Sequence, residues 1–446
     1  MAFLPPAATG IGHQDDEVSL AKDSAALAPG QPCRCTSSTA GIAAGAGLVT
    51  PGLLALPDFR RLWLVGFVTY LVRWLEMLAF GLFAYDITGS AFIVALLSML
   101  RLLPMGLFGA FLGVAADRFE RRNALIVMVT VSFSCALVLV VLASLDAIKV
   151  WHLAVASFLN GICWAADNPV RRSMVGDVVG PDRMGRAMSV EIATSNLSRI
   201  LGPMLSGVLL AQYGIASVFG LTAILYAASF AAALRVGVRH APAREQPMSF
   251  MASMREGLTW LRSDRPLIGV FLITIIFNIF GWPFLSMVPI IGTDYLHLGP
   301  KGVGLLASCE GVGGLIGAVL LGSFVRPAWQ GRVYVGSVAI YFVVVIGFAT
   351  ASAVPMAALL LFLVGIFSVG FAALQTTLVY RCSPVAMRAR YLGLLSVCIG
   401  TGPIGFLYIG FLADLLTPQV GTVALAAQGA LALLFTRPLW TPVLRR

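Results

Sequence analysis

The sequence predicts an all-α polytopic membrane protein whose twelve transmembrane helices form two pseudo-symmetric six-helix bundles. Of the 446 residues, 59% are hydrophobic and only 11% are charged, and the mean hydropathy is +0.91. A soluble domain of this length could not cover its core with so little polar surface, so the solvent must be lipid. The apolar residues also form long runs, and the basic residues gather on alternate loops between these runs.

The net charge is +10. In a soluble protein this charge would suggest a nucleic-acid partner. Here the basic residues are distributed by loop, as expected of a chain that marks its cytoplasmic side with arginine. The expected partner is therefore the lipid bilayer, and no nucleic acid is expected.

Residues 1–57 are predicted to be a disordered tail that precedes the first helix. They are rich in Ala, Gly, Ser and Pro and contain no apolar run long enough for the core of a signal peptide. Cys33 and Cys35 lack a third or fourth ligand at suitable spacing, so no metal site is predicted.

Twelve later segments have roughly the length, about 20 residues, that crosses a bilayer. The predicted spans are 61–87, 91–116, 123–146, 150–170, 187–212, 215–235, 267–292, 302–325, 333–352, 355–380, 391–414 and 419–437. They divide the chain into a first bundle at 58–235, a linker at 236–265, a second bundle at 266–440 and a C-terminal tail at 441–446.

The arginines predict the orientation. Lys149 and Lys301 are the only basic residues on one side of the predicted topology, whereas the loops of the other side hold many arginines, including Arg171 and Arg172. This bias predicts that both termini lie in the cytoplasm. The expected location of the protein is the inner membrane of the cell. The linker carries prolines and arginines, and residues 248–261 within it are predicted to form an amphipathic helix on the membrane surface.

The two halves resemble each other in sequence. The residues from Val94 to Asp117 can be laid over those from Val303 to Arg326 with a constant offset, so the eighth segment repeats the second. Internal repeats of this kind are typical of transporters in which two bundles rock about a central site.

The loop between the second and third segments carries a motif at five positions. Its residues are Gly113, Asp117, Arg118, Arg121 and Arg122. The motif resembles the Gly-x-x-x-Asp-Arg-x-Gly-Arg-Arg signature of the major facilitator superfamily, except that Glu120 stands where that family usually has glycine.

Residues 57–440 as a whole resemble this superfamily and, within it, the branch of enterobactin-exporter-like and macrolide-efflux-like permeases. The resemblance is carried further by Asp167-Asn168-Pro169, by Arg199 with Gly202-Pro203, and by Phe277-Asn278 with Pro283. It implies that Asp117 caps the start of the eleventh segment near Arg388 and Arg390, as a cytoplasmic latch between the two bundles. The alternative is that the loop motif serves only as a topology signal.

Five ionisable residues are predicted to lie deep in the membrane, where charges are costly and are functional candidates. They are Arg73, Glu76, Arg101, Arg199 and Glu310. The sequence has no phosphate-binding loop for ATP, so an ion gradient is the expected energy source.

Glu76 and Glu310 are the proton-coupling candidates, because a carboxyl at low dielectric can change its charge while arginine stays ionised. Glu76 is the preferred carrier of the two. Arg73 and Glu76 lie three residues apart on one helix face, so they are expected to pair or to face the cavity together. Arg101 is expected to pair with Glu310 at the matching place in the repeat. The alternative is that these charges neutralise one another and hold the helices together. Nearer the cytoplasm, a gate is expected to be supported by Glu191, Asp167 and Asn168.

Six residues are candidates to line a substrate cavity, although packing or lipid contact would explain each of them equally well. They are Trp74, Trp164, Phe277, Asn278, Phe280 and Trp282.

The predicted function is proton-coupled export of a small amphipathic organic compound, such as a drug, a secondary metabolite or a siderophore. Export follows from the resemblance alone. Uptake by proton symport remains open, and so does a non-transporting membrane scaffold or sensor. An enzyme is not expected, because no clustered catalytic set is present. No cofactor is expected, and a single chain is the expected functional unit.

Overall fold

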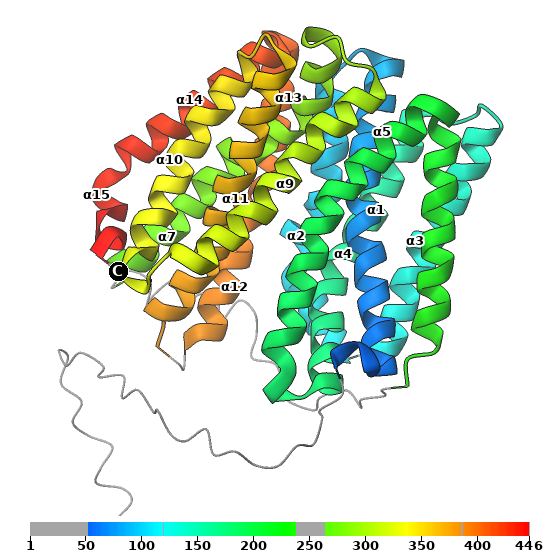
Figure 1. Cartoon of the computed structure of the whole chain (residues 1–446), viewed down its shortest axis with the longest axis horizontal. Helices are drawn as coiled ribbons and strands as arrows, with labels where there is room; N and C mark the ends of the chain where they lie inside the picture. The colour runs from blue at the N-terminus through cyan, green and yellow to red at the C-terminus, as the bar shows by residue number, and fades with distance from the viewer. Residues whose placement is uncertain (1–51, 119, 238–263, 385–386, 446) are drawn as a thin grey trace, which may run out of the picture. The chain divides into compact units, whose positions relative to one another are not determined.

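The structure, a computed structural model, describes residues 52–118, 120–237, 264–384 and 387–445. Within these ranges all regular secondary structure is helical, with no strand. The helices are α1 (Pro57–Thr88), α2 (Ala91–Arg118), α3 (Arg121–Ser144), α4 (Val150–Val179), α5 (Pro181–Leu234), α7 (Arg265–Ile276), α8 (Val288–Ile290), α9 (Pro300–Phe324), α10 (Gln330–Ala349), α11 (Val354–Cys382), α12 (Arg388–Ile399), α13 (Gly402–Leu415), α14 (Pro418–Phe435) and α15 (Arg437–Trp440) (Figure 1).

The helices follow the predicted spans in order and to within a few residues at most ends. In the described part of the chain, nine helical ranges are long and apolar enough to cross a membrane. One of them, α5, covers two predicted spans, because its backbone leaves the helical conformation at Gly214, where φ is +73°. The nine ranges thus account for ten predicted spans. The remaining two spans correspond to α2 and α4, for which membrane crossing stays a prediction.

The seventh segment, Arg265–Tyr295, is not a regular α-helix. After α7, residues Phe277–Gly281 form a π-helical turn, and Trp282–Met287 tighten into a 3₁₀ helix before α8. Pro283 lies in the 3₁₀ helix and Pro289 in α8, and proline cannot donate the amide hydrogen bond that an α-helix needs at these places. Interruptions of this kind are common where a helix lines a functional cavity.

Helices α1 to α5 pack on one another, and so do helices α7 to α15. The main contacts between these two halves join α5 to α9 and α2 to α13 (Figure 1). Glycines allow this close approach: a Cβ atom added to Gly207 would lie 2.9 Å from Cα of Gly304, and one added to Gly106 would lie 2.8 Å from the carbonyl oxygen of Gly400. The two contacts are equivalent under the predicted repeat, since each joins the second segment of one half to the fifth of the other.

The end of the chain differs from its prediction. Residues 441–445, expected to be a tail, form a 3₁₀ turn whose Val443 is buried against α7 and α10. A Cβ atom added to Gly331 of α10 would meet the Val443 carbonyl oxygen, so the absence of a side chain at this glycine lets the turn pack closely. The predicted N-terminal tail up to residue 51 and the predicted surface helix at 248–261 lie outside the described residues. The other domain boundaries stay predictions.

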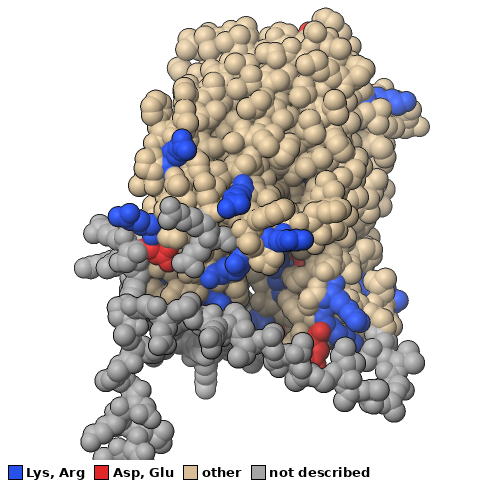
Figure 2. Space-filling model, turned by 60° about the vertical axis from the view of Figure 1, so that its left-hand side comes forward, with Lys and Arg blue, Asp and Glu red and all other residues tan. Residues whose placement is uncertain are grey.

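Charged side chains are distributed unevenly over the surface. In the face shown in Figure 2, most basic side chains lie in the lower half of the view, and the upper half carries only a few. A region poor in charge beside a basic one is the pattern of a protein that spans a bilayer.

Candidate functional site

A cavity lies between the two halves of the protein, beside the middle of α1 and of α9. It contains about 550 Å³ of empty space, including space open to solvent. We call it the central cavity. The first half lines it with Trp74, Met77, Leu78, Val94, Ser98, Arg199 and Pro203, and the second half with Leu285, Ser286, Val288, Pro289, Ala307, Glu310 and Leu361. The lining is mostly apolar with a few polar groups, as in typical sites for small organic ligands.

An ion pair between the two halves lies at the wall of this cavity. Nη2 of Arg199 on α5 donates to Oε1 of Glu310 on α9. Glu310 is 4% exposed, and the guanidinium of Arg199 also lies 4.9 Å from the centre of the Trp74 ring. The sequence placed both residues in the membrane but did not predict that they pair.

The predicted pair of Arg101 with Glu310 is wrong. The repeat puts the two residues at matching places, but α2 packs on α13 while α9 packs on α5. Equivalent positions of the two halves therefore lie at two different contacts between the halves, too far apart for an ion pair.

Arg101 instead pairs with Glu76. Its Nη2 lies 2.9 Å from Oε2 of Glu76, and the same oxygen accepts a hydrogen bond of 3.1 Å from Asn160 Nδ2 on α4. Glu76 is 1% exposed. Three helices thus meet at one carboxylate.

The predicted pair of Arg73 with Glu76 is also wrong. The two side chains leave α1 one turn apart but about 60° apart around the axis, and the guanidinium of Arg73 stacks on the Trp164 ring at 3.8 Å. Arg73 and Trp164 border a second space, inside the first half, of about 400 Å³. We call it the inner pocket; its lining is Thr69, Arg73, Arg101, Met128, Val129, Ser132, Asn160, Cys163, Trp164, Asp167 and Tyr226.

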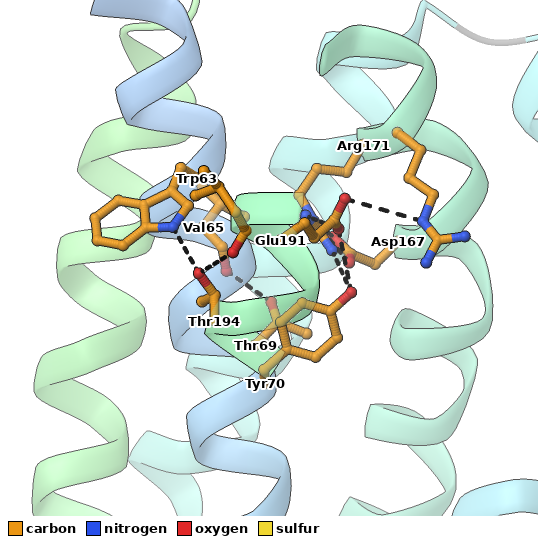
Figure 3. A network of polar contacts seen from close by, with 10 residues as sticks. Trp63, Val65, Thr69, Tyr70, Asp167, Arg171, Glu191 and Thr194 are labelled. Atoms are coloured by element: carbon orange, nitrogen blue, oxygen red, sulfur yellow. Dashed lines mark hydrogen bonds and ion pairs between the residues drawn. The ribbon is translucent and has the colours of Figure 1, made fainter. Parts of the chain in front are cut away.

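A buried polar network joins α1, α4 and α5 (Figure 3). Arg171 is at its centre and is 2% exposed. Its Nε donates to Asp167 Oδ2 at 2.9 Å, its Nη1 to Glu191 Oε1 at 2.6 Å, and its Nη2 to the Tyr70 hydroxyl at 3.2 Å. The Tyr70 hydroxyl in turn donates to Glu191 Oε1 at 3.1 Å.

From the sequence, Arg171 is expected on a cytoplasmic loop, where it would have no part in the site. It lies within α4, and its spacing of four residues from Asp167 was the signal that could have revealed the pair. The network holds Glu191 and Asp167, two of the three predicted gate residues. The side chain of the third, Asn168, lies outside the described residues.

The predicted latch can be described only in part, because the side chains of Gly113, Asp117 and Arg118 lie outside the described residues. Arg121 pairs with Asp177 of α4 at 2.8 Å, and Arg122 donates to the Leu234 carbonyl oxygen at 2.7 Å. These two arginines therefore brace the first half. On the other side, the Arg388 guanidinium lies 4.8 Å from the Tyr380 ring centre, and Arg390 Nη1 contacts Met387 Sδ at 2.9 Å.

At the opposite end of the helices, polar contacts join the two halves directly. The Tyr85 hydroxyl at the end of α1 donates to Asp294 Oδ2. Asp414 of α13 accepts from the Ser90 hydroxyl at 3.2 Å and from the Phe92 amide at 3.1 Å. These contacts could not be expected from the sequence, because single aspartates near helix ends carry no motif.

The structure places only some of the six cavity candidates at a cavity or pocket and packs the others against neighbouring residues. Trp74 lines the central cavity and Trp164 the inner pocket. Phe277 is buried and stacks on Phe371 at 3.8 Å, so it belongs to the core of the second half. The same holds for Asn278, which is 2% exposed and donates to the Thr274 carbonyl oxygen.

The last two candidates, Phe280 and Trp282, pack edge to face against Tyr408 and Phe406 of α13. The irregular segment reaches the central cavity one to two turns later than predicted, at Leu285 to Pro289. The interruption of the helix by its π-helical and 3₁₀ turns shifts which face points inward.

Two helical halves that enclose a central cavity, with an interrupted seventh segment, are the architecture of a major facilitator transporter. A family model described as transmembrane secretion effector matches residues 51–441. The chain belongs to this family of the major facilitator superfamily.

Curated relatives are similar at low identity. Macrolide efflux protein A of Streptococcus pyogenes is 24% identical over 271 residues, which cover 60% of this chain and 66% of that protein, a little under two thirds of its length. The staphyloferrin A transporter of Staphylococcus aureus is 23% identical over 78% of this chain and 87% of its own length. The multidrug efflux pump Tap of Mycolicibacterium fortuitum is 26% identical over 76% and 85%.

Solved structures show the same fold. The nucleoside transporter NupG has a TM-score of 0.71 at 13% identity and covers 86% of this chain and 100% of its own. The POT family transporter PepTSo has a TM-score of 0.71 at 12% identity and covers 87% of this chain and 98% of its own. At such identities the likeness concerns the fold alone.

Proposed function

We propose that this protein is a secondary transporter that exports a small amphipathic organic compound by alternating access. The observation that carries the proposal is the central cavity, which is lined from both halves and crossed at its wall by the Arg199–Glu310 ion pair. A site shared by two bundles can be exposed to either side of the membrane when the bundles rock against each other. The names of the relatives, which concern macrolides, staphyloferrin A and multiple drugs, support small organic molecules as the class of substrate.

We propose protons as the coupling ion, with Glu310 and Glu76 as the groups that could carry them. Glu310 is the more direct candidate, because its partner Arg199 belongs to the other half. Protonation would neutralise Glu310 and remove an ion pair that holds the halves together at the cavity. Protonation of Glu76 would instead release Arg101 within the first half.

The orientation follows from the arginines and stays part of the proposal. The end that carries Arg121, Arg381 and most other basic residues would face the cytoplasm of the inner membrane. The contacts of Asp294 and Asp414 would then close the outer end of the protein.

The test is retention of candidate compounds in cells that lack their own efflux pumps. Cells with the wild-type protein should retain less of a transported drug or siderophore than cells with an empty vector. The variant Glu310→Gln, expressed at the same level in the membrane, is the inactive control. Retention that rises with the wild-type protein would show uptake, and unchanged retention across a broad panel would contradict transport.

A further inference from the structure

Arg73 is a cation inside the membrane-spanning part of the protein without an anionic partner. The two acids at this depth are both occupied, Glu76 by Arg101 and Glu310 by Arg199. In the part of the chain that the structure describes, the Arg73 side chain takes part in no ion pair or side-chain hydrogen bond, and its interactions are with aromatic rings.

The other acid near Arg73 is also occupied. Asp167 lines the inner pocket, but both of its carboxylate oxygens accept from Nε of Arg171, at 2.9 and 3.2 Å. Glu191, deeper in the same network, is held by Arg171 and Tyr70. The acid nearest to Arg73 along α1, Glu76, points to other helices.

The charged groups at the cavity, at the pocket and in the adjoining polar network balance in number but not in their pairing. The four guanidinium groups are those of Arg73, Arg101, Arg171 and Arg199, and the four carboxylates are those of Glu76, Asp167, Glu191 and Glu310. Arg171 pairs with two of the carboxylates, so Arg73 is the one guanidinium of this set without an ion pair of its own. An unpaired charge in a membrane is costly unless a counter-charge arrives from elsewhere.

The inner pocket also has hydrogen-bond donors without acceptors. Nη1 of Arg101 and Nε1 of Trp164 are buried and lack partners, and Arg101 is only 9% exposed. Two acceptors, Glu76 Oε1 and Asn160 Oδ1, lack partners there as well. Neither of these acceptors neutralises Arg73. Asn160 carries no charge, and Glu76 is already paired with Arg101.

We infer that the inner pocket binds the acid group of an organic monoanion, a carboxylate, with Arg73 as its counter-charge. A guanidinium matches a carboxylate with two parallel hydrogen bonds, and its face can stay on the Trp164 ring at the same time. The Trp74 ring lies 5.8 Å from Arg73 and 4.9 Å from Arg199, and it lines the central cavity. An aromatic or otherwise flat ligand body therefore extends from Arg73 along Trp74 toward that cavity. This inference rests on the proposed function and names the class of its substrate.

The test is a binding measurement on the purified full-length protein, which requires no transport. Calorimetric titration compares 2-naphthoate with 2-naphthamide, which has the same ring system without the charge, and uses sodium chloride as an inorganic anion. We expect 2-naphthoate to bind at least tenfold more tightly than 2-naphthamide, and chloride not to displace it at equal concentration.

Variants then locate the site. Arg73→Gln should remove the preference for 2-naphthoate, and Arg73→Lys, which keeps the charge but not the fork of donors, should retain part of it. Arg186→Gln changes an exposed cation on α5 and should retain all of it. A preference that survives in Arg73→Gln would overturn the inference.

Other outcomes are equally decisive. Equal affinity of the wild-type protein for the two naphthalene compounds, or binding of neither, would overturn the inference even if a variant failed to fold. Binding of chloride alone would make Arg73 the site of an inorganic counter-ion and overturn it too. Preferential binding of 2-naphthoate without export of any compound would instead contradict the proposed function and leave the anion site standing.

Discussion

Arg199 of α5 and Glu310 of α9 form an ion pair that joins the two halves of the protein at the central cavity. The neighbouring backbones approach so closely that a Cβ atom added to Gly311 would lie 2.7 Å from the carbonyl carbon of Arg199. Charge pairing and close helix packing therefore occur at the same place, which makes this contact the first to test.

Removing one partner of the pair should destabilise the protein strongly. Arg199→Ala leaves Glu310 buried without its partner, a change that costs about 3–5 kcal/mol for buried pairs. The double variant Arg199→Ala with Glu310→Ala should cost less than the sum of the two single variants. Unfolding in detergent gives the three free energies. Simple additivity would contradict a direct interaction.

Glu310 and Glu76 can be separated as proton carriers by substitution with glutamine, which keeps the size and removes the charge. We expect Glu310→Gln to abolish export driven by an imposed pH gradient while exchange down a substrate gradient continues. Glu76→Gln keeps a group that can accept from Asn160 and should have a smaller effect. The measurement is transport in proteoliposomes. Uphill export by Glu310→Gln and its loss in Glu76→Gln would reverse the assignment.

Gly207 should tolerate no side chain, because a Cβ atom there would lie 2.5 Å from the Pro300 carbonyl oxygen and 2.9 Å from Cα of Gly304. Gly207→Ala should lower the stability by about 1–3 kcal/mol, as expected for overpacking. Gly220, also on α5, has nothing within 4 Å of the added atom. Gly220→Ala is the matched control and should be neutral or slightly stabilising. Equal effects in thermal unfolding would argue against the close contact of α5 with α9.

Arg171 should matter for stability far more than its neighbour Arg172. Arg171→Ala leaves Asp167 and Glu191 buried without their shared partner and should cost about 3–5 kcal/mol. The Arg172 side chain is 53% exposed and lies 4.0 Å from Glu191, so Arg172→Ala should cost at most about 1 kcal/mol. Chemical unfolding of the two variants side by side provides the comparison. A small effect of Arg171→Ala would show that water replaces its contacts.

Asp414 should keep the two halves closed at the end of the protein where it joins α13 to the start of α2. Asp414→Ala removes the acceptor of the Ser90 hydroxyl and of the Phe92 amide. We expect this end to open more often, which would speed maleimide labelling of a cysteine introduced at Ser286 in the central cavity. The control is Asp146→Ala, which changes an exposed aspartate in the connection between α3 and α4. Equal labelling rates in both variants would contradict a closing role for Asp414.

The sequence by itself determined the helical segments and their order. Lipid cannot satisfy free backbone groups, so each uncharged run of sufficient length must be helical. The runs before Gly89 and before Gly214 end where a positive φ interrupts the helix, and such glycines are visible in the sequence. The superfamily was also accessible, because the motif from Gly113 to Arg122 lies in one short loop.

Only the tertiary structure decided which charges pair. Hydropathy gives the depth of Arg73, Arg101 and Glu310 in the membrane, but not the direction in which each side chain leaves its helix or the helix it faces. Glu76 meets Arg101 and Asn160 because α2 and α4 pack beside α1 at that level. The same packing leaves Arg73 against Trp164 without an anion. Depth is a property of one segment, whereas pairing depends on the rotation and neighbours of several segments, and these are set by the packing of the whole chain.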